Sequence, residues 1–478
     1  MNYRIITYTL GWVLNIEAAC MLLPLLCAVL YKEECVSLFF ICILLCLAVG
    51  GALVFKSPRN KTMYSKEGFI TVALSWIIMS IFGAFPFYIS GYIPSFIDAL
   101  FETVSGFTTT GASVLTDVDV LPKSLLFWRS FTHWIGGMGV LVFLVAILPL
   151  SGGGNMYLLK AESPGPSVSK LVPKVRSTAK ILYGIYIAIT VAQVIFMLFG
   201  GANLFDALTI SFGTAGTGGF GIKNSSIAEY SPYIQNVVTI FMIIFGVDFS
   251  LYYLILIKKF GLAIKSDEVR GYFGIIIASI IIICFNCRDL FQSLGETIRH
   301  AAFQVASIIT TTGYSTTDFD KWPELSKTIL VMLMFIGACA GSTGGGIKVS
   351  RILILLKSIV KEIKIAAHPR STHKIKMNSR VVEHETVRAI NVFIAAYFAI
   401  YMFSVLIISI DNADFTTNFT AVAATINNIG PGLAKVGPTR NFSLYSPLST
   451  LVLTFDMLVG RLEIFPILIL FSPYTWKK

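Results

Sequence analysis

Apolar runs of about twenty residues recur along the whole chain, and they restrict its fold more than any other feature. Residues 10–30 and 36–55 form the first two runs, and others follow as far as the C-terminus. A run of this length crosses the hydrocarbon core of a bilayer as an α-helix. Inside a bilayer only helices and closed barrels satisfy their own backbone hydrogen bonds. The sequence therefore predicts an all-α polytopic membrane protein.

The composition excludes an ordinary soluble domain. Of the 478 residues, 55% are hydrophobic and 13% are charged, whereas soluble proteins carry roughly a quarter charged residues. The first run is longer than the apolar core of a cleavable signal peptide, so we interpret it as a retained span. All the runs together predict ten long helices, at residues 8–31, 36–55, 68–91, 124–150, 177–200, 233–258, 271–288, 326–358, 387–410 and 444–472.

The net charge of +11 is not gathered in one tail, as a nucleic-acid-binding segment would require. Its distribution indicates membrane topology instead. Basic residues concentrate after every second predicted helix and at the C-terminus, in the segments 56–66, 160–176, 258–270, 357–388 and 477–478. Cytoplasmic loops of membrane proteins are enriched in Lys and Arg. We therefore expect a multi-pass protein with both termini in the cytoplasm.

The opposite side of the predicted helices carries a repeated unit. Four semi-apolar stretches are too short to span, and each has an acidic residue near its start: Phe96–Phe107, Leu204–Gly213, Leu294–Ile309 and Asp414–Ile426. Each stretch leads to a glycine-bearing loop and then to another long helix. The loops are roughly one hundred residues apart, which indicates one supersecondary unit repeated four times. We expect the copies to surround a pseudo-fourfold pore, as repeats 61–160, 161–265, 266–375 and 376–478 after an N-terminal hairpin, 1–60.

The glycine loops have the composition of a cation filter. Irregular backbone at membrane depth must be buried by protein or line water, and glycine lets successive carbonyls turn toward one axis. Rings of carbonyl oxygens can replace the hydration shell of a monovalent cation, and the C-terminal ends of the short helices add partial negative charge. Ordinary outer turns are the alternative, which four phased copies disfavour. The predicted filter residues are Thr109, Thr110, Gly111, Gly216, Thr217, Gly218, Thr311, Thr312, Gly313, Asn428, Ile429 and Gly430.

A second glycine cluster interrupts the eighth predicted helix, at Gly341, Ser342, Thr343, Gly344, Gly345 and Gly346. Each glycine costs about 1 kcal/mol inside a helix, so the cluster should unwind the span. A phosphate loop needs a strand before it and Lys directly after its last glycine; here Ile347 intervenes and the flanks are helical. The alternatives that remain are a mobile intramembrane loop and a packing kink.

Charged residues inside the predicted spans are candidates for function, because charge at membrane depth is costly. Arg461 lies well inside the last predicted helix. We expect it to project into the pore as a barrier to cations; the alternative is a structural pair with Asp456 or Glu463. For Asp248 we expect a structural pair with another residue, and for His133 a packing role. Four outer acids either concentrate cations at the mouth or form solvated turns: Asp117, Asp119, Asp318 and Asp320.

An enzyme is disfavoured. Three of the five histidines, His368, His373 and His384, lie in one basic loop, and no triad or metal cluster is evident. The close pair Cys284 and Cys287 has no second pair with which to hold zinc, so we expect the cysteines to be packing residues. No cofactor is expected in this chain, and no GxGxxG dinucleotide motif follows a strand.

The motifs resemble bacterial Trk-type potassium uptake subunits of the Trk/Ktr/HKT superfamily of cation transporters. The matching stretches are TTTGAS at 108–113, WIGGMG at 134–139, TGGF at 217–220, TTTGY at 310–314, GSTGGGIK at 341–348, NNIGPG at 427–432 and GRLEIF at 460–465. The N-terminal hairpin resembles the Trk branch in particular. In this superfamily a serine in place of the first filter glycine goes with sodium permeation. The glycine at all four positions therefore implies preference for potassium, although the second and fourth loops depart from TTTG.

The resemblance also implies how the pore works. It implies potassium uptake across the bacterial inner membrane, gated by the intramembrane glycine loop and Arg461. It further implies a homodimer and a separate cytosolic RCK-type regulatory subunit (TrkA-like), which would bind the nucleotide (ATP/ADP or NAD) that this chain does not. A secondary transporter, a K+/Na+ or K+/H+ symporter with the same pore, is the alternative. Such transporters often use inverted repeats, whereas all four units here have one orientation.

Overall fold

The N-terminal segment forms the predicted hairpin. The computed structural model describes residues 1–58, 63–139, 175–370 and 372–476. Helices α1 (Tyr3–Cys20) and α2 (Leu22–Tyr31) make one long span, and α3 (Cys35–Val54) returns beside it. The helices approach closely at Gly11 and Gly50, where a Cβ on either glycine would lie within 3 Å of the other's carbonyl oxygen. The hairpin contacts the rest of the bundle through α4 and α6.

Four units follow, each with a long helix, a short helix and then a further helix of 13 to 15 residues. Their bounds are α4 (Ser65–Ile89), α5 (Phe96–Phe107) and α6 (Lys123–Gly137); α9 (Val175–Phe199), α10 (Leu204–Gly216) and α11 (Pro232–Phe245); α14 (Asp267–Asn286), α15 (Leu294–Ile309) and α16 (Glu324–Ile336); α18 (His384–Ile408), α19 (Phe415–Ile426) and α20 (Pro447–Arg461). Six helices of the described residues are long and apolar enough to cross a membrane, or seven with one bent pair. The all-α membrane fold is confirmed.

Each short helix begins at a side-chain cap. Ser95, Asn203, Ser293 and Asp414 each accept a hydrogen bond from the backbone N–H three residues later. Such caps satisfy backbone donors that a helix start leaves free. At α19 the hydrogen bonds from the Thr417 hydroxyl and backbone lower the pKa of Asp414, so its charge is retained beside the positive helix end. Of the acidic residues near these starts, Asp414 is itself the cap, and Asp98, Asp206 and Glu296 lie in the first helical turn, where a negative charge is favourable.

The predicted second span of each repeat is not continuous in the described residues. Helices α6, α11, α16 and α20 stop after 13 to 15 residues. Helix α11 is followed by α12 (Phe249–Leu256) at a bend of 90°, because Asp248 caps the new helix by accepting from the Ser250 N–H. Residues 337–348 separate α16 from α17 (Val349–Ala367). The predictions of unbroken helices at 233–258 and 444–472 were therefore wrong, and residues 140–150 of the predicted fourth helix lie outside the described part of the chain.

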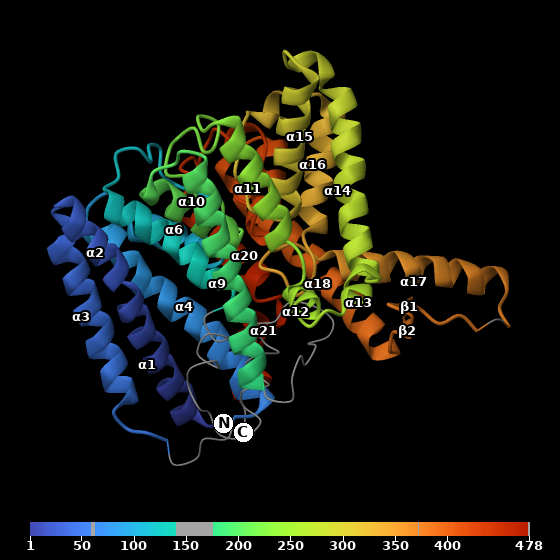
Figure 1. Cartoon of the computed structure of the whole chain (residues 1–478). Coiled ribbons are helices and arrows are strands. Elements are labelled where there is room, and N and C mark those ends of the chain that lie inside the picture. Colours follow the sequence, from blue (N-terminus) through green and yellow to red (C-terminus); the bar gives the residue numbers. More distant parts are fainter. Residues whose placement is uncertain (59–62, 140–174, 371, 477–478) are drawn as a thin grey trace.

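The remaining elements lie outside the four repeated units. Helix α17 projects sideways from the bundle and leads to the short antiparallel pair β1 (Lys376–Met377) and β2 (Arg380–Val381), in which Lys376 pairs with Val381 (Figure 1). Helices α13 (Phe260–Ile264), α21 (Phe465–Phe471) and α22 (Pro473–Trp476) are short. Both termini lie at one end of the molecule (Figure 1), opposite the loops that follow the short helices α10 and α15.

Candidate functional site

The four short helices end in one repeated hydrogen-bond pattern. At α5 the Thr109 N–H bonds to the Gly106 carbonyl and the Thr110 N–H to the Ser105 carbonyl. The same two bonds recur at residues 217 and 218, at 311 and 312, and at 428 and 429. This is the Schellman motif, which normally places glycine in the left-handed conformation just after a helix.

Here the left-handed residue is never glycine. Thr109, Thr217, Thr311 and Asn428 have φ values of 57°, 57°, 58° and 55°. A β-branched residue at positive φ is uncommon, and such a conformation costs of order 1–3 kcal/mol unless its surroundings impose it. Strain of this kind clusters at functional sites, and here it recurs at the same position in each repeat.

Two residues after each strained position lies a glycine that touches the next loop. The four glycines, Gly111, Gly219, Gly313 and Gly430, have positive φ. A Cβ on Gly111 would overlap the Gly218 carbonyl oxygen, one on Gly219 that of Thr312, and one on Gly313 that of Ile429. A Cβ on Gly430 would lie 2.9 Å from the Thr110 carbonyl oxygen. The four contacts close a ring in which every loop packs on the carbonyl of its neighbour.

The ring corrects the alignment of the second loop. The sequence pattern predicts Gly218 as the equivalent of Gly111, Gly313 and Gly430. In the structure Gly218 follows the left-handed Thr217 directly, as Thr110 follows Thr109, and the positive φ belongs to Gly219. The predicted triplet was therefore one residue out of register: Gly216 is the last residue of α10. Two adjacent glycines made the register ambiguous in the sequence.

A cavity opens on the face of the ring opposite the termini, which we call its outer side (Figure 1). It has a volume of about 160 Å³, and all four positive-φ glycines line it, together with Arg129, Asn224 and Pro431. The loops around it are bonded in sequence: Asn224 donates to Asp117 and Asp119, the Ile227 N–H to the Ser315 carbonyl, the Ala434 N–H to Asp320, and the Phe442 N–H to the Ser113 carbonyl. Three of the four outer acids thus hold the mouth together.

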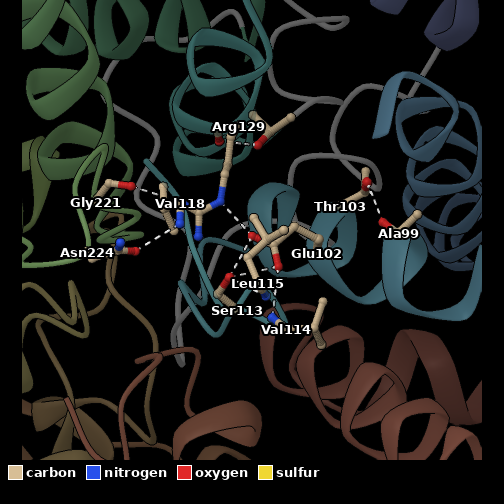
Figure 2. A network of polar contacts seen from close by, with 11 residues as sticks. Ala99, Glu102, Thr103, Ser113, Val114, Leu115, Val118, Arg129, Gly221 and Asn224 are labelled. Carbon is tan, nitrogen blue, oxygen red and sulfur yellow. Dashed lines mark hydrogen bonds and ion pairs between the residues drawn. The ribbon is translucent and has the colours of Figure 1, made fainter. Parts of the chain in front are cut away.

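A buried ion pair supports the first and second loops (Figure 2). Arg129 Nε of α6 lies 2.6 Å from Glu102 Oε1 of α5, and both side chains are at most 3% exposed. Glu102 also accepts from the Ser113 hydroxyl and the Val114 N–H, just beyond Gly111. Arg129 donates to the Gly221 carbonyl, and its guanidinium lies 3.6 Å from the centre of the Phe220 ring. The pair joins one loop to the next.

The glycine loop, residues 337–348, lies on the inner side of the ring. Its Gly345 N–H donates to Thr311 Oγ1 at 2.6 Å, and its Gly346 N–H donates to the Asn427 carbonyl. Positive φ values at Gly337, Gly341 and Gly346 explain why this segment cannot continue the helix. Inside the loop the Lys348 ammonium donates to the Gly344 carbonyl. The predicted interruption is present and touches the third and fourth filter loops.

Arg461 bridges the glycine loop to the first repeat. It is the last residue of α20 and not a mid-helix residue, because Glu463 and Ile464 have positive φ and end the helix. Its guanidinium donates to the Thr343 carbonyl at 2.8 Å and to the Gly137 carbonyl of α6 at 2.7 Å. The two acids that the sequence offered as partners of Arg461 make these bonds: Glu463 pairs with Arg351, and Asp456 accepts from the Ser404 hydroxyl.

A second cavity, of about 80 Å³, lies beside this bridge. Gly344, Gly345, Lys348, Arg461 and Trp76 are among the residues that line it. The ring therefore lies between two cavities, and the glycine loop and Arg461 stand at the inner one. Among the described residues no three His, Cys, Asp or Glu side chains are grouped so that they could hold a metal ion.

Several functional candidates were missed in the sequence. Glu102 and Arg129 were not considered, although a charge inside an apolar segment is itself a signal. Lys348 stands at the end of the GSTGGGIK stretch, and its bond to the Gly344 carbonyl was not predicted. His133, by contrast, packs as expected, stacked on Phe220 with ring centres 4.3 Å apart. Asp248, for which a structural pair was expected, instead caps α12 by accepting from the Ser250 N–H and hydroxyl.

Comparisons with known proteins agree over the full chain. A family model named TrkH and described as "Cation transport protein" matches residues 36–286 and 288–478. The chain is 37% identical to the Trk system potassium uptake protein TrkH of Salmonella typhimurium, over 100% of both chains. It is 33% identical to TrkG of Escherichia coli, over 100% of this chain and 99% of that protein. The crystal structure of the potassium transporter TrkH from Vibrio parahaemolyticus superposes with a TM-score of 0.90 at 33% identity and 100% coverage of both.

Proposed function

Because the chain belongs to the TrkH family of cation transport proteins, we propose that it is a potassium uptake protein whose pore runs through the ring of four glycine loops. Its relatives named above are potassium uptake transporters and not enzymes. The single observation that carries the proposal is the closed ring, in which each loop glycine packs on a carbonyl of the next loop.

The filter of this pore comprises residues 109–111, 217–219, 311–313 and 428–430. Carbonyl oxygens from four loops can coordinate a dehydrated monovalent cation. Four short helices end at the ring, and their partial negative charges favour a cation there. Potassium is the cargo and not a resident cofactor. Entry would proceed from the outer cavity through the ring to the cavity at the glycine loop.

The gate of this pore is the glycine loop with Arg461. Two observations support it: the loop bonds to the filter through Gly345 and Gly346, and Arg461 ties it to α6. A fixed positive charge on the path of a cation is an electrostatic barrier. We place the protein in the bacterial inner membrane with both termini inside, as a homodimer. Control by a cytosolic, nucleotide-binding partner (TrkA-like) fits relatives that are named as parts of a Trk system.

Substitution of the first filter glycine tests the proposal. In Gly111→Ser the side chain would displace the Gly218 carbonyl, so the ring should lose its match to potassium and admit more sodium. The variant is reconstituted into proteoliposomes, and the fluxes of rubidium and of sodium are measured. Gly91→Ser is the matched control, since Gly91 also has positive φ (76°) but has nothing within 4 Å of its Cβ position. An unchanged sodium-to-rubidium ratio in Gly111→Ser would contradict the filter assignment.

A further inference from the structure

Glu268, near the start of α14, bonds to the backbone on both sides of the glycine run 341–346. Its Oε1 accepts from the Ala340 N–H at 2.7 Å and from the Ser350 N–H at 3.1 Å. Ala340 precedes the glycine run, and Ser350 lies in the first turn of α17 beyond it. One carboxylate oxygen therefore closes the loop at its base.

Asp267, the residue before Glu268, bonds to a different part of the molecule. Its N–H donates to Asn378 Oδ1 at 2.7 Å, and its Oδ2 accepts from the Asn378 N–H at 3.1 Å. Lys357 Nζ lies 3.0 Å from the same Oδ2 and also donates to the Lys376 carbonyl. The turn of the β1–β2 hairpin is thus fixed to the residue adjacent to the one that closes the loop.

The bonded route from the hairpin to the filter is continuous. It passes from Asn378 to Asp267, along one peptide unit to Glu268, and from there to the backbone N–H groups of Ala340 and Ser350 on either side of the glycine run. From the loop it reaches the filter through Gly345 and Thr311. A displacement of the hairpin must therefore move the anchor of the loop or break one of these bonds.

We propose that Glu268 is a positioning residue for the gate and that the β1–β2 hairpin acts on the gate through Asp267. The inference rests on the proposed function, since it takes the glycine loop to limit ion flow. Glu268 does not line either of the two cavities next to the filter; it acts through the loop that it anchors.

The native Cys339 reports the position of the loop. It lies within the loop and its side chain is fully buried. In purified partner-free protein, maleimide labelling of Cys339 is followed by mass spectrometry, with buried Cys46 of α3 as an internal reference. Glu268→Ala should raise the rate at Cys339 by about fivefold or more, because two hydrogen bonds to a charged acceptor are lost. Partner-free rubidium flux should rise with it.

Two further variants serve as controls for this result. Glu268→Gln keeps an acceptor oxygen at the same reach and should restore most of the protection of Cys339. Glu385→Ala removes an exposed acid from the first turn of α18 and should change nothing. Labelling of Cys339 at the wild-type rate in Glu268→Ala, or an equal rise at Cys46, would overturn the positioning role.

Asn378→Gly tests the hairpin. Asn378 has φ of 51°, which glycine adopts freely, so the substitution removes the acceptor and keeps the turn. We expect the labelling rate of Cys339 to rise less, by about twofold, because one hydrogen bond at an exposed site is lost. When Asn378→Gly is added to Glu268→Ala, the labelling rate should not rise further. Wild-type labelling in Asn378→Gly combined with Asp267→Ala, which also removes the acceptor of the Asn378 N–H and the partner of Lys357, would exclude coupling from the hairpin.

The two proposals fail in different ways. If Glu268→Ala exposes Cys339 while flux stays at the wild-type level, Glu268 positions the loop but the loop is not the gate, and the proposed function is wrong on that point. If Arg461→Ala raises flux while Glu268→Ala changes neither labelling nor flux, the gate stands and only the role of Glu268 is lost.

Discussion

The four filter loops and the glycine loop are both irregular backbone inside a helix bundle, yet they are held differently. Each filter loop is fixed by backbone bonds to its own helix and by packing on the next loop's carbonyl. The glycine loop is also bonded through its backbone, as at Gly346, but further hydrogen bonds to it come from the side chains of Glu268, Thr311 and Arg461. Side-chain hydrogen bonds can be broken one at a time, whereas a shift of one filter loop also displaces the neighbouring loop on whose carbonyl it packs. The difference favours selectivity for the first region and control for the second.

The largest expected effect breaks the ring at the glycine that the structure reassigns. In Gly219→Ala the new Cβ would overlap the Thr312 carbonyl and hold a φ of 73°, a conformation that costs about 1–3 kcal/mol before any overlap. Rubidium uptake should fall to background and the unfolding temperature should drop. Gly201→Ala has the same kind of φ (84°) in open space and should keep its flux. Equal flux in the two variants would refute the ring.

The support of the ring should be the next most sensitive element. Arg129→Met leaves Glu102 buried without its cation, which typically costs about 3–5 kcal/mol. Thermal unfolding in detergent should show the loss, and the double variant Glu102→Gln with Arg129→Met should recover part of it. Lys223→Met removes an exposed pair with Glu229 and should cost under about 1 kcal/mol. Equal losses in the exposed and buried variants would show that the pair does not support the loops.

In the proposed gate, Arg461→Ala should increase ion flow without altering the selectivity between sodium and rubidium. It removes hydrogen bonds from a charged donor to the loop and to α6, each typically about 1.5–3 kcal/mol. Partner-free rubidium flux should rise about tenfold or more at an unchanged sodium-to-rubidium ratio, and Arg461→Lys should lie between. Flux at the wild-type level would mean that Arg461 does not limit permeation.

The smallest effect separates two equivalent threonines. Thr311 Oγ1 accepts from the Gly345 N–H, whereas Thr109 Oγ1 has no hydrogen-bond partner among the described residues. Valine retains the β-branched shape at both positions. Thr311→Val should weaken the loop by about 1 kcal/mol and raise partner-free flux several-fold, and Thr109→Val should leave it unchanged. The same flux from both variants would mean that the loop does not depend on the third filter.

Much of this comparison could be predicted from the sequence, because apolar length and repetition are local signals. The bounds of α5 and α15 agree with the predicted Phe96–Phe107 and Leu294–Ile309. The repeat boundaries at 61, 161, 266 and 376 and the roles of the filter and gate residues stay predictions.

What the sequence could not provide depends on contacts between distant segments. Hydropathy alone does not reveal the 90° bend at Asp248 or the end of α20 at Arg461, since both flanks are apolar and either could continue a helix. The register at Gly218 and Gly219 is decided by which glycine meets the Thr312 carbonyl. The link between Glu268 and Ala340 joins residues 72 positions apart, and no local pattern marks it.

The most direct measurement of the central claim compares Gly111→Ser with Arg461→Ala in the same proteoliposomes, following rubidium and sodium flux without any partner. The account predicts that Gly111→Ser raises the sodium-to-rubidium ratio and that Arg461→Ala raises both fluxes at a constant ratio. A shift of the ratio in Arg461→Ala, or a constant ratio in Gly111→Ser, would contradict the division between filter and gate.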